Sequence, residues 1–180
     1  MSGKNGEALP ENDEFDRQRR RVLWALPTGL YLIGSRHADT VNLMTANLLT
    51  QVCIEPKLVG VAVEANSVTA GLIDQGQAFT VSMLARQDKD IVRRFVKPVP
   101  ADQVERAADG TVTSMVGHAV TEVGRQKLPV LAAAAGYLLC QLTDQRPLGS
   151  HTFCIGEVIE VGGEPSEVLR MEDTRMHYGG

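Results

Sequence analysis

The chain has 180 residues, of which 43% are hydrophobic and 4% aromatic, and it carries a formal net charge of -4 at pH 7. This length suits one domain whose core is large enough to fold without disulfide or metal cross-links. The acidic balance and the few aromatic side chains provide neither the basic surface nor the stacking platforms that nucleic-acid-binding proteins use.

The N-terminal part of the chain is polar before it becomes amphipathic. Residues 1–14 are polar and contain scattered glycines, which predicts a disordered tail ahead of a domain at 15–180. We expect an amphipathic helix from about Phe15 to Leu26, with Val22 and Leu23 on its apolar face.

The basic run Arg17–Arg21, followed by apolar residues, superficially resembles an export signal. An acidic stretch precedes the run, Pro27 and Gly29 divide the apolar part, and no small-residue cleavage site follows. No apolar segment is long enough to span a bilayer. The sequence therefore predicts a cytoplasmic protein that does not associate with membranes.

A hairpin and a further strand are predicted after this helix. Residues 29–34 form an apolar strand, 36–40 form a turn, and 42–56 form a second apolar segment that ends at a proline. Residues 57–63 are typical of an ordinary buried strand.

Short helices and strands alternate in the middle of the chain. We expect a helix at 67–75 capped by Ser67, a strand at 78–84 and a second short helix at 88–96. The weak periodicity of 101–129 predicts no element.

Two long strands are predicted at 131–142 and 151–161, joined by a turn at 144–149. Their closeness along the chain favours an antiparallel pair. Many closely spaced strands with only short helices indicate a closed or nearly closed antiparallel barrel, not a βαβ sheet.

Three cysteines, Cys53, Cys140 and Cys154, lie in apolar runs without CxxC spacing. Such cysteines are typical of small core side chains in a reducing compartment, not of a zinc site.

The four histidines, His37, His118, His151 and His177, belong to no HExxH or other metal pattern. The sequence also lacks a GxSxG elbow, a phosphate-binding GxxxxGK[ST] loop and a GxGxxG turn, so we expect no bound metal and no Rossmann unit.

Uncharged hydrogen-bonding side chains are instead set into apolar surroundings. They form three groups: Thr45, Asn47 and Thr50; Asn66, Ser67 and Thr69; and His151 and Thr152. These groups suit a flat neutral heterocycle whose anionic tail could be held by the free N–H groups of a helix that begins near Ser67. They could equally cap the helix and satisfy strand edges, and the spacing leaves both interpretations open.

A series of motifs follows in a fixed order along the chain: Thr28–Tyr31, Leu43–Asn47, Val52–Val59, Ser67–Thr69, Phe79–Leu84, Arg94–Phe95 and Gly149–Val158. With these gaps the series resembles the flavin reductase-like family of FMN-binding split barrels, over about residues 15–161. The resemblance implies a mostly β, single-domain, antiparallel Greek-key split β-barrel with short helices. It also implies a homodimer that binds FMN or FAD and uses NADH or NADPH.

By the same resemblance, the flavin contacts fall on Asn42, Leu43, Met44, Thr45, Asn47, Leu48 and Thr50, and the phosphate loop on Ala65, Asn66, Ser67, Val68 and Thr69. His151 corresponds to a family histidine on the flavin face where the nicotinamide stacks, which implies a catalytic role. His177 and Tyr178 resemble the family's closing Arg-Tyr-Gly, although the arginine is missing.

The chain departs from the family pattern in its phosphate loop. Many relatives have Lys-Ser-Ser-Arg-Thr where this chain has Ala65–Thr69, so both cations are absent. A charge-assisted hydrogen bond to phosphate is worth very roughly 1.5 to 3 kcal/mol. Arg93, Arg94 or a dimer partner could supply a cation instead. Leu43 also replaces a glycine, and Ser150 replaces the aspartate before the histidine.

The resemblance implies a reductase that passes hydride from NAD(P)H to the flavin, which then reaches a downstream acceptor or oxygenase. The altered loop and Ser150 leave open an electron-transfer module whose bound flavin is reduced by a partner protein. A deazaflavin-dependent enzyme of related fold is a third reading, although the anionic tail of deazaflavin suits a loop without cations poorly.

Overall fold

The computed structural model describes residues 13–164, 167–174 and 176. Its main sheet is antiparallel and contains seven strands in the order β2-β1-β5-β10-β11-β4-β3. Their bounds are β1 Tyr31–His37, β2 Thr40–Ala46, β3 Leu49–Cys53, β4 Leu58–Glu64, β5 Ala78–Met83, β10 Gly136–Leu148 and β11 His151–Gly163. The predicted hairpin is confirmed, since β1 pairs with β2 from Tyr31 opposite Ala46 to His37 opposite Thr40.

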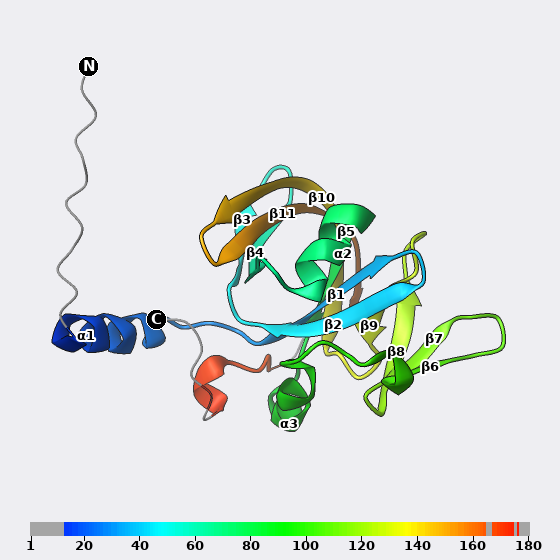
Figure 1. Cartoon of the computed structure of the whole chain (residues 1–180), viewed down its shortest axis with the longest axis horizontal. Coiled ribbons are helices and arrows are strands. Elements are labelled where there is room, and N and C mark those ends of the chain that lie inside the picture. Colours follow the sequence, from blue (N-terminus) through cyan, green and yellow to red (C-terminus); the bar gives the residue numbers. More distant parts are fainter. Residues whose placement is uncertain (1–12, 165–166, 175, 177–180) are drawn as a thin grey trace, which may run out of the picture.

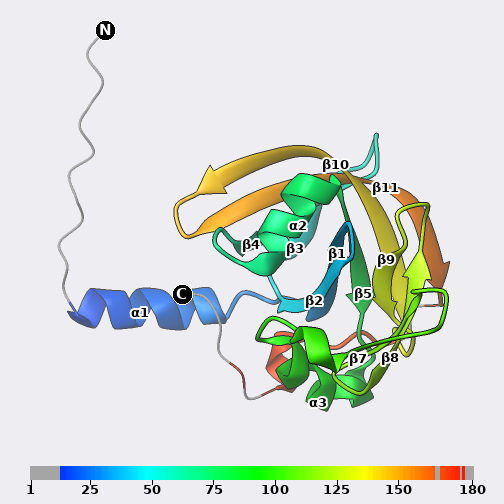
Figure 2. The same cartoon turned by 45° about the vertical axis from the view of Figure 1, so that its right-hand side comes forward.

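The two edges of this sheet come together because a very short link joins them. β2 and β3 are the outermost strands, yet only Asn47 and Leu48 separate them along the chain. A residue of extended chain spans at most about 3.5 Å, so the sheet must roll up until its edges meet. The N–H of Ala62 donates to the carbonyl of Leu48 at 2.9 Å and ties this link to β4. Figures 1 and 2 show the rolled sheet around α2.

The mostly β antiparallel architecture is therefore confirmed, but the single strand predicted over 42–56 is wrong. The segment is divided into β2 and β3 at Asn47 and Leu48. A continuous strand could not leave one edge of the sheet and enter the other. Leu49 packs against the same core cluster as Met44 and Ala46, whereas Thr50, Gln51 and Val52 of β3 are exposed.

Helix α2, Val68–Gly76, confirms the predicted helix and its cap. Ser67 has extended backbone angles, and its Oγ accepts the N–H of Ala70 at 3.1 Å. Leu72 and Ile73 are buried, so this face of the helix packs into the rolled sheet. The helix ends at Gln77, whose left-handed conformation lets its N–H donate to the carbonyl of Ile73 at 2.8 Å.

A second antiparallel sheet occupies the region where the sequence pattern predicted no element. It has four strands in the order β6-β7-β8-β9, with bounds β6 Val104–Arg106, β7 Val112–Met115, β8 His118–Val123 and β9 Leu128–Leu131. These strands are too short for a clear period. The sheet packs closely on β1, because a Cβ on Gly34 would lie 2.2 Å from the carbonyl oxygen of Pro129. The Thr80 hydroxyl also donates to that oxygen, at 2.6 Å.

The terminal hairpin is longer than predicted. The expected strands at 131–142 and 151–161 appear as β10, which starts at Gly136 and continues to Leu148, and β11. The turn lies at Gly149, with φ +66°, and Ser150, not at 144–149. Residues 143–146 of β10 are polar, and none of the last six residues of the strand is buried, so hydropathy alone marks this part as a loop.

The remaining helices are α1 Asp13–Trp24, α3 Lys89–Val92 and the 3-10 turns η1 Arg86–Asp88, η2 Arg93–Phe95, η3 Ala101–Gln103 and η4 Met171–Asp173. The helix predicted at 88–96 is thus α3 flanked by two 3-10 turns, and its residues Val92 and Phe95 are buried. Along the described chain, no helix is both long and apolar enough to cross a bilayer.

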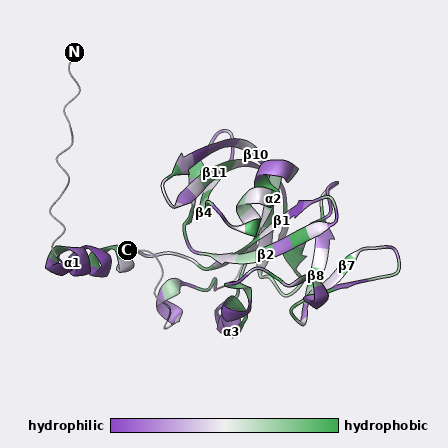
Figure 3. Ribbon diagram, viewed as in Figure 1, coloured by the Kyte–Doolittle hydropathy of each residue, from purple (hydrophilic) through white to green (hydrophobic). Residues whose placement is uncertain are grey.

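Helix α1 begins at Asp13, before the predicted start at Phe15, and none of its residues is buried. It stands away from the sheets in both views (Figures 1 and 2) and is mostly hydrophilic (Figure 3). Pairs such as Arg20–Asp16, at 2.7 Å, lie within the helix itself. The rest of the predicted tail, residues 1–12, lies outside the described residues.

Two of the three cysteines are core residues. Burial raises the pKa of the Cys140 thiol to about 12, and burial together with the charge of Asp74 raises that of Cys154 to about 11. Cys53, at the end of β3, is half-buried, so its predicted place in the core is wrong. All three are free cysteines.

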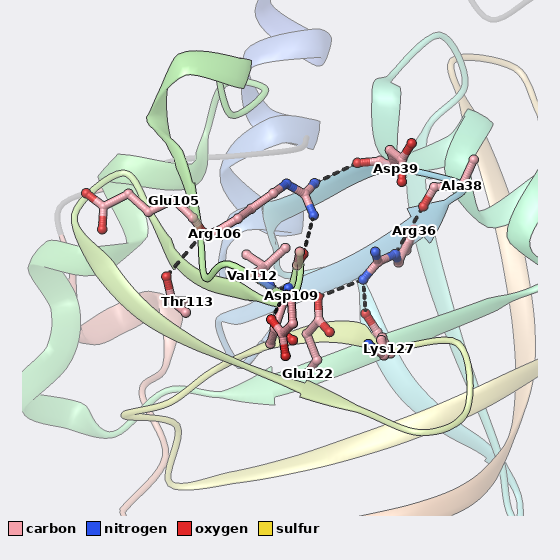
Figure 4. Close-up of polar contacts among 12 residues, drawn as sticks. Arg36, Ala38, Asp39, Glu105, Arg106, Asp109, Val112, Thr113, Glu122 and Lys127 are labelled. Atoms are coloured by element: carbon pink, nitrogen blue, oxygen red, sulfur yellow. Dashed lines mark hydrogen bonds and ion pairs between the residues drawn. The ribbon is translucent and has the colours of Figure 1, made fainter.

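A buried ion pair holds the small sheet against the β1–β2 hairpin (Figure 4). Arg36 Nη1 donates to Glu122 Oε1 at 2.7 Å, and the two side chains are only 14% and 5% exposed. Arg36 also donates to the carbonyl oxygens of Lys127 and Ala38, at 2.9 and 3.1 Å, while Glu122 accepts the N–H of Val112 at 2.9 Å. The pair therefore satisfies turn and strand groups of both sheets.

We expect Arg36→Met to lower the free energy of unfolding by about 3 kcal/mol, because it leaves the Glu122 carboxylate buried without its cation. Arg146→Met is the matched control, since Arg146 pairs with Asp144 at an exposed position, and it should cost less than about 1 kcal/mol. Urea unfolding of both variants measures the difference. Equal losses would contradict a structural role for the Arg36 pair.

Candidate functional site

A narrow cavity of about 100 Å³ lies where the rolled sheet closes. Its described lining residues are Leu30, Met44, Thr45, Ala46, Asn47, Ala62, Glu64, Val96, Met171 and Met176. The cavity therefore combines the end of β2, the link to β3 and the end of β4. It brings together three of the predicted site residues, Met44, Thr45 and Asn47.

Asn47 is the polar residue of this cavity that the protein leaves unsatisfied. Its side chain is 5% exposed, and among the described residues its Oδ1 has no hydrogen-bond partner. A buried acceptor without a donor destabilises a fold, and such groups are uncommon unless something else binds there. Thr45 beside it is satisfied, because its hydroxyl donates to the carbonyl of Val92 at 2.7 Å. The cavity wall therefore offers a buried acceptor to a ligand that carries a hydrogen-bond donor.

Asn42 and Leu43 are buried in the protein interior. The Asn42 amide donates to the Thr69 hydroxyl at 2.9 Å, and its Oδ1 accepts the N–H of Val99 at 2.9 Å. Asn42 thereby joins β2 to α2 and to the segment after α3. Leu43 is fully buried in the core, so only its backbone could approach a ligand.

Leu48 and Thr50 lie on the outer side of the closure. Leu48 is 38% exposed. Thr50 is exposed on β3, where its hydroxyl donates to the neighbouring carbonyl of Gln51 at 3.4 Å. The structure therefore separates these two predicted residues from the cavity lining formed by Thr45 and Asn47.

The predicted phosphate loop, Ala65–Thr69, follows β4 directly and leads into α2. Two of its N–H groups are used within the protein, since Ser67 N donates to Glu64 O and Ala65 N to Ser150 O, both at 3.0 Å. In the portion of the chain that is described, the N–H groups of Asn66, Val68 and Thr69 have no acceptor, and the last two open α2. These two groups lie at the positive end of the helix dipole, where an anion is stabilised.

The pairing of β4 with β11 places His151 next to this loop. His151 is directly opposite Glu64 in the strand register, so their side chains share one face of the sheet. The Ser150 hydroxyl lies 2.9 Å from His151 Nδ1. This contact joins the ring to the turn that precedes β11. The imidazole is half-buried, and it is not among the described residues that line the cavity.

The other histidines do not join this group. His37 is exposed at the end of β1, and His118 stacks against Phe95 with ring centroids 5.8 Å apart. His177 and Tyr178 lie outside the described residues. Within the described ranges, no three His, Cys, Asp or Glu side chains are placed to hold a metal ion.

A larger groove, of about 1000 Å³, runs between the foot of α1 and the segment after β11. It contains none of the predicted flavin contacts, although Met171 and Met176 line both the groove and the cavity. Backbone bonds such as Leu30 N to Leu169 O, 3.0 Å, bring its two walls together from distant parts of the sequence. The sequence carried no signal for the groove or for Glu64. We place the site at the cavity, where the unsatisfied amide lies.

The unsatisfied amide makes a test possible without any ligand. Asn47→Leu should raise the free energy of unfolding of the ligand-free protein by about 1 kcal/mol, because it removes a buried acceptor that lacks a donor. Asn42→Leu is the matched control, and should lower stability by roughly 2 to 3 kcal/mol, because both of its amide bonds are made. Urea unfolding measures both, and a large loss in Asn47→Leu would show that its amide is satisfied.

Comparisons with known proteins show which family this chain belongs to. A family model described as "Flavin reductase like domain" matches residues 23–179. The NADH-dependent FAD reductase of Streptomyces globisporus is 31% identical over 151 residues, which are 82% of this chain and 76% of that protein. The reductase component of 4-nitrophenol 4-monooxygenase/4-nitrocatechol 2-monooxygenase from Rhodococcus opacus is 26% identical over 141 residues, 78% of this chain and 69% of that protein.

Among solved structures, the Streptomyces globisporus C-1027 NADH:FAD oxidoreductase SgcE6 superimposes with a TM-score of 0.73. It is 23% identical, and the match covers 98% of this chain and 95% of that one. This likeness extends the family match from sequence to fold. The chain belongs to the flavin reductase-like family.

Proposed function

We propose that this chain, an oxidoreductase that passes hydride from NADH or NADPH to FMN or FAD, holds its flavin at the cavity where the sheet closes. The observation that carries the proposal is the buried, unpartnered Oδ1 of Asn47 in that cavity. A flavin ring has an N–H group on its edge that fits this acceptor. The flavin supplies the hydride-accepting chemistry, and the protein supplies binding, orientation and exclusion of water.

The predicted contacts take different roles in this proposal. Asn47, Thr45 and Met44 form the wall beside the flavin, supported from behind by Asn42 and Leu43. Leu48 and Thr50 form the outer rim, and the loop Ala65–Thr69 faces the phosphate through the N–H groups of Val68 and Thr69. Asn66, exposed in the same loop, adds its backbone N–H and its side-chain amide to the groups that face the phosphate.

His151 is the proposed catalytic residue that contacts the nicotinamide. The β4–β11 register supports this assignment, because it places His151 beside the loop and opposite Glu64, which lines the cavity. Ser150 is proposed as its positioning residue through the 2.9 Å contact with Nδ1. Ser150 therefore gives the His151 imidazole a hydrogen-bond partner at the position where many relatives have aspartate.

His151→Ala should lower kcat/KM for NADH roughly ten- to a hundredfold, because the nicotinamide loses an oriented contact, while flavin affinity stays within about twofold. Ser150→Ala should give a smaller loss that Ser150→Thr restores, since threonine keeps the hydroxyl. His37→Ala, an exposed histidine at the end of β1, is the control and should have no effect. Steady-state kinetics that find His151→Ala unchanged would remove the catalytic assignment.

The downstream acceptor is proposed to be a flavin-dependent oxygenase. One relative is the reductase component of such a system, a 4-nitrophenol monooxygenase, which supports this choice. We further propose a homodimer, supported by the exposed apolar side chains of Val22, Leu23 and Leu26 on or after α1. Three free cysteines support a reducing, cytoplasmic location.

The proposed function is tested by the visible spectrum of the purified protein with added FMN or FAD, before and after NADH or NADPH under anaerobic conditions. We expect flavin binding and bleaching of the flavin band by at least one nicotinamide. Light scattering of the same sample should give twice the mass of one chain. A protein that binds flavin but is not bleached would favour an electron-transfer module, and one that binds none would contradict the proposal.

A further inference from the structure

Helix α1 carries an apolar stripe that no described part of the chain buries. Phe15, Val22 and Leu23 recur at the seven- and eight-residue spacings that place side chains on one face of a helix, and Leu26 follows the end of the helix. These four side chains, the helix stripe, are 44, 64, 44 and 60% exposed. Figures 1 and 2 show the helix standing away from both sheets.

Such a helix needs a surface to pack against. A helix of twelve residues is marginal in water, and most of the stability of protein helices comes from packing of an apolar face. The ion pairs of α1, such as Arg17–Glu14 at 2.6 Å, are exposed, and exposed pairs contribute little. The helix stripe is therefore the part of α1 that a contact would stabilise.

A groove of suitable size lies at the foot of the helix. It measures about 1000 Å³ and is lined by residues 24–29 and 167–174, among others. A helix is about 10 to 12 Å wide and rises about 5.4 Å per turn, so this volume accommodates about two turns. The floor is held by bonds from Leu30 N to Leu169 O, 3.0 Å, and from Met171 N to Thr28 O, 2.9 Å. Of α1 itself only the last residue, Trp24, lines the groove, so the rest of the helix lies outside it.

The helix and the groove also differ in charge. Four arginines lie within Arg17–Arg21 of the helix. The groove wall carries Glu167, Glu172 and Asp173. Arg86 neutralises Asp173 at 2.7 Å, whereas the other two carboxylates, 81 and 71% exposed, have only exposed arginine partners, at 3.8 and 3.3 Å. A basic helix is attracted to such a wall.

These features point to a second copy of the same chain as the occupant of the groove. The helix and the groove meet at Trp24, so a two-fold axis beside this residue places each helix in the groove of the other chain. This arrangement covers both surfaces at once, whereas a different protein would have to offer both a matching groove and a matching helix. We propose that two chains exchange α1, with the helix stripe of each seated in the partner's groove. The inference rests on the homodimer of the proposed function and names its interface.

Trp24 gives a direct signal from this interface, because it is the one tryptophan of the sequence. It lines the groove and is 42% exposed in the single chain. Dilution of the flavin-free protein should shift the tryptophan emission to longer wavelength at the concentration where light scattering records the loss of half the mass. An emission that stays constant across this transition would overturn the inference. A monomer at every concentration would contradict the homodimer as well.

Substitution of the helix stripe tests the apolar contact. The double variant Val22→Asp, Leu26→Asp should raise the dissociation constant of the dimer by about a hundredfold or more, because it places charges in an apolar contact. Val161→Asp, Leu148→Asp is the matched control, since these side chains are 65 and 60% exposed but lie on β11 and β10. Analytical ultracentrifugation should find the control within about threefold of the unmodified protein. Dissociation of the control alone would place the interface on β10 and β11 and overturn the inference.

A variant of the groove separates exchange from direct pairing of two α1 helices. Glu167→Arg, Glu172→Arg should weaken the dimer by about tenfold at low ionic strength, because the groove then repels the arginines of the helix. Glu105→Arg, Glu157→Arg makes the same charge change at exposed positions on β6 and β11 and should have little effect. A groove variant that dimerises normally would overturn the exchange. If the helix variant also dimerises normally, the homodimer stands without this interface, and flavin reduction by the same samples tests the proposed activity separately.

Discussion

The short link between β2 and β3 is the constraint on which the rest of the structure depends. Asn47 and Leu48 connect one edge of the seven-stranded sheet to the other. Because two residues span only a short distance, the two edges must lie next to each other and the sheet closes. The carbonyl groups of the link accept the N–H groups of Leu49 and Ala62, at 3.0 and 2.9 Å. At the same seam the Asn47 side-chain oxygen is buried and has no hydrogen-bond partner among the described residues. The link that closes the barrel therefore also places a buried acceptor in the wall of the cavity.

The remaining parts of the site are positioned by strand pairing around this seam. β4 pairs with β3 on one side and with β11 on the other, so its last residue, Glu64, lies between the cavity and His151. The loop at Ala65–Thr69 then begins at that strand end and leads into α2 inside the rolled sheet. Residues far apart in the sequence meet because one strand, β4, touches each of them. The Arg36–Glu122 pair fixes the second sheet against the other end of β1, away from this site.

Much of the fold could be predicted from local pattern, and the exceptions have physical causes. The start of α2 could be predicted from Ser67, because helix capping is a local interaction. The β10–β11 hairpin could be predicted from two apolar segments on either side of a turn. The break at Asn47 could not be predicted, because it depends on which strands are neighbours and not on hydropathy. Glu64 had no signal, since an exposed acid at a strand end is common in any protein. The family resemblance predicted which residues contact the flavin, whereas only the structure shows that Asn42 and Leu43 lie in the protein interior.

The cap of α2 has a consequence for how this site can change through evolution. The helix is secured by the hydroxyls of Ser67 and Thr69, whereas an anion would be met by backbone N–H groups that every residue except proline possesses. The side chains of Ala65, Asn66 and Val68 neither cap the helix nor are needed for the backbone N–H groups to meet an anion. These three positions can therefore gain or lose charge through single substitutions without unfolding the helix. Substitutions at these three positions can therefore change which ligand binds, while Ser67 and Thr69 keep the fold of the helix unchanged.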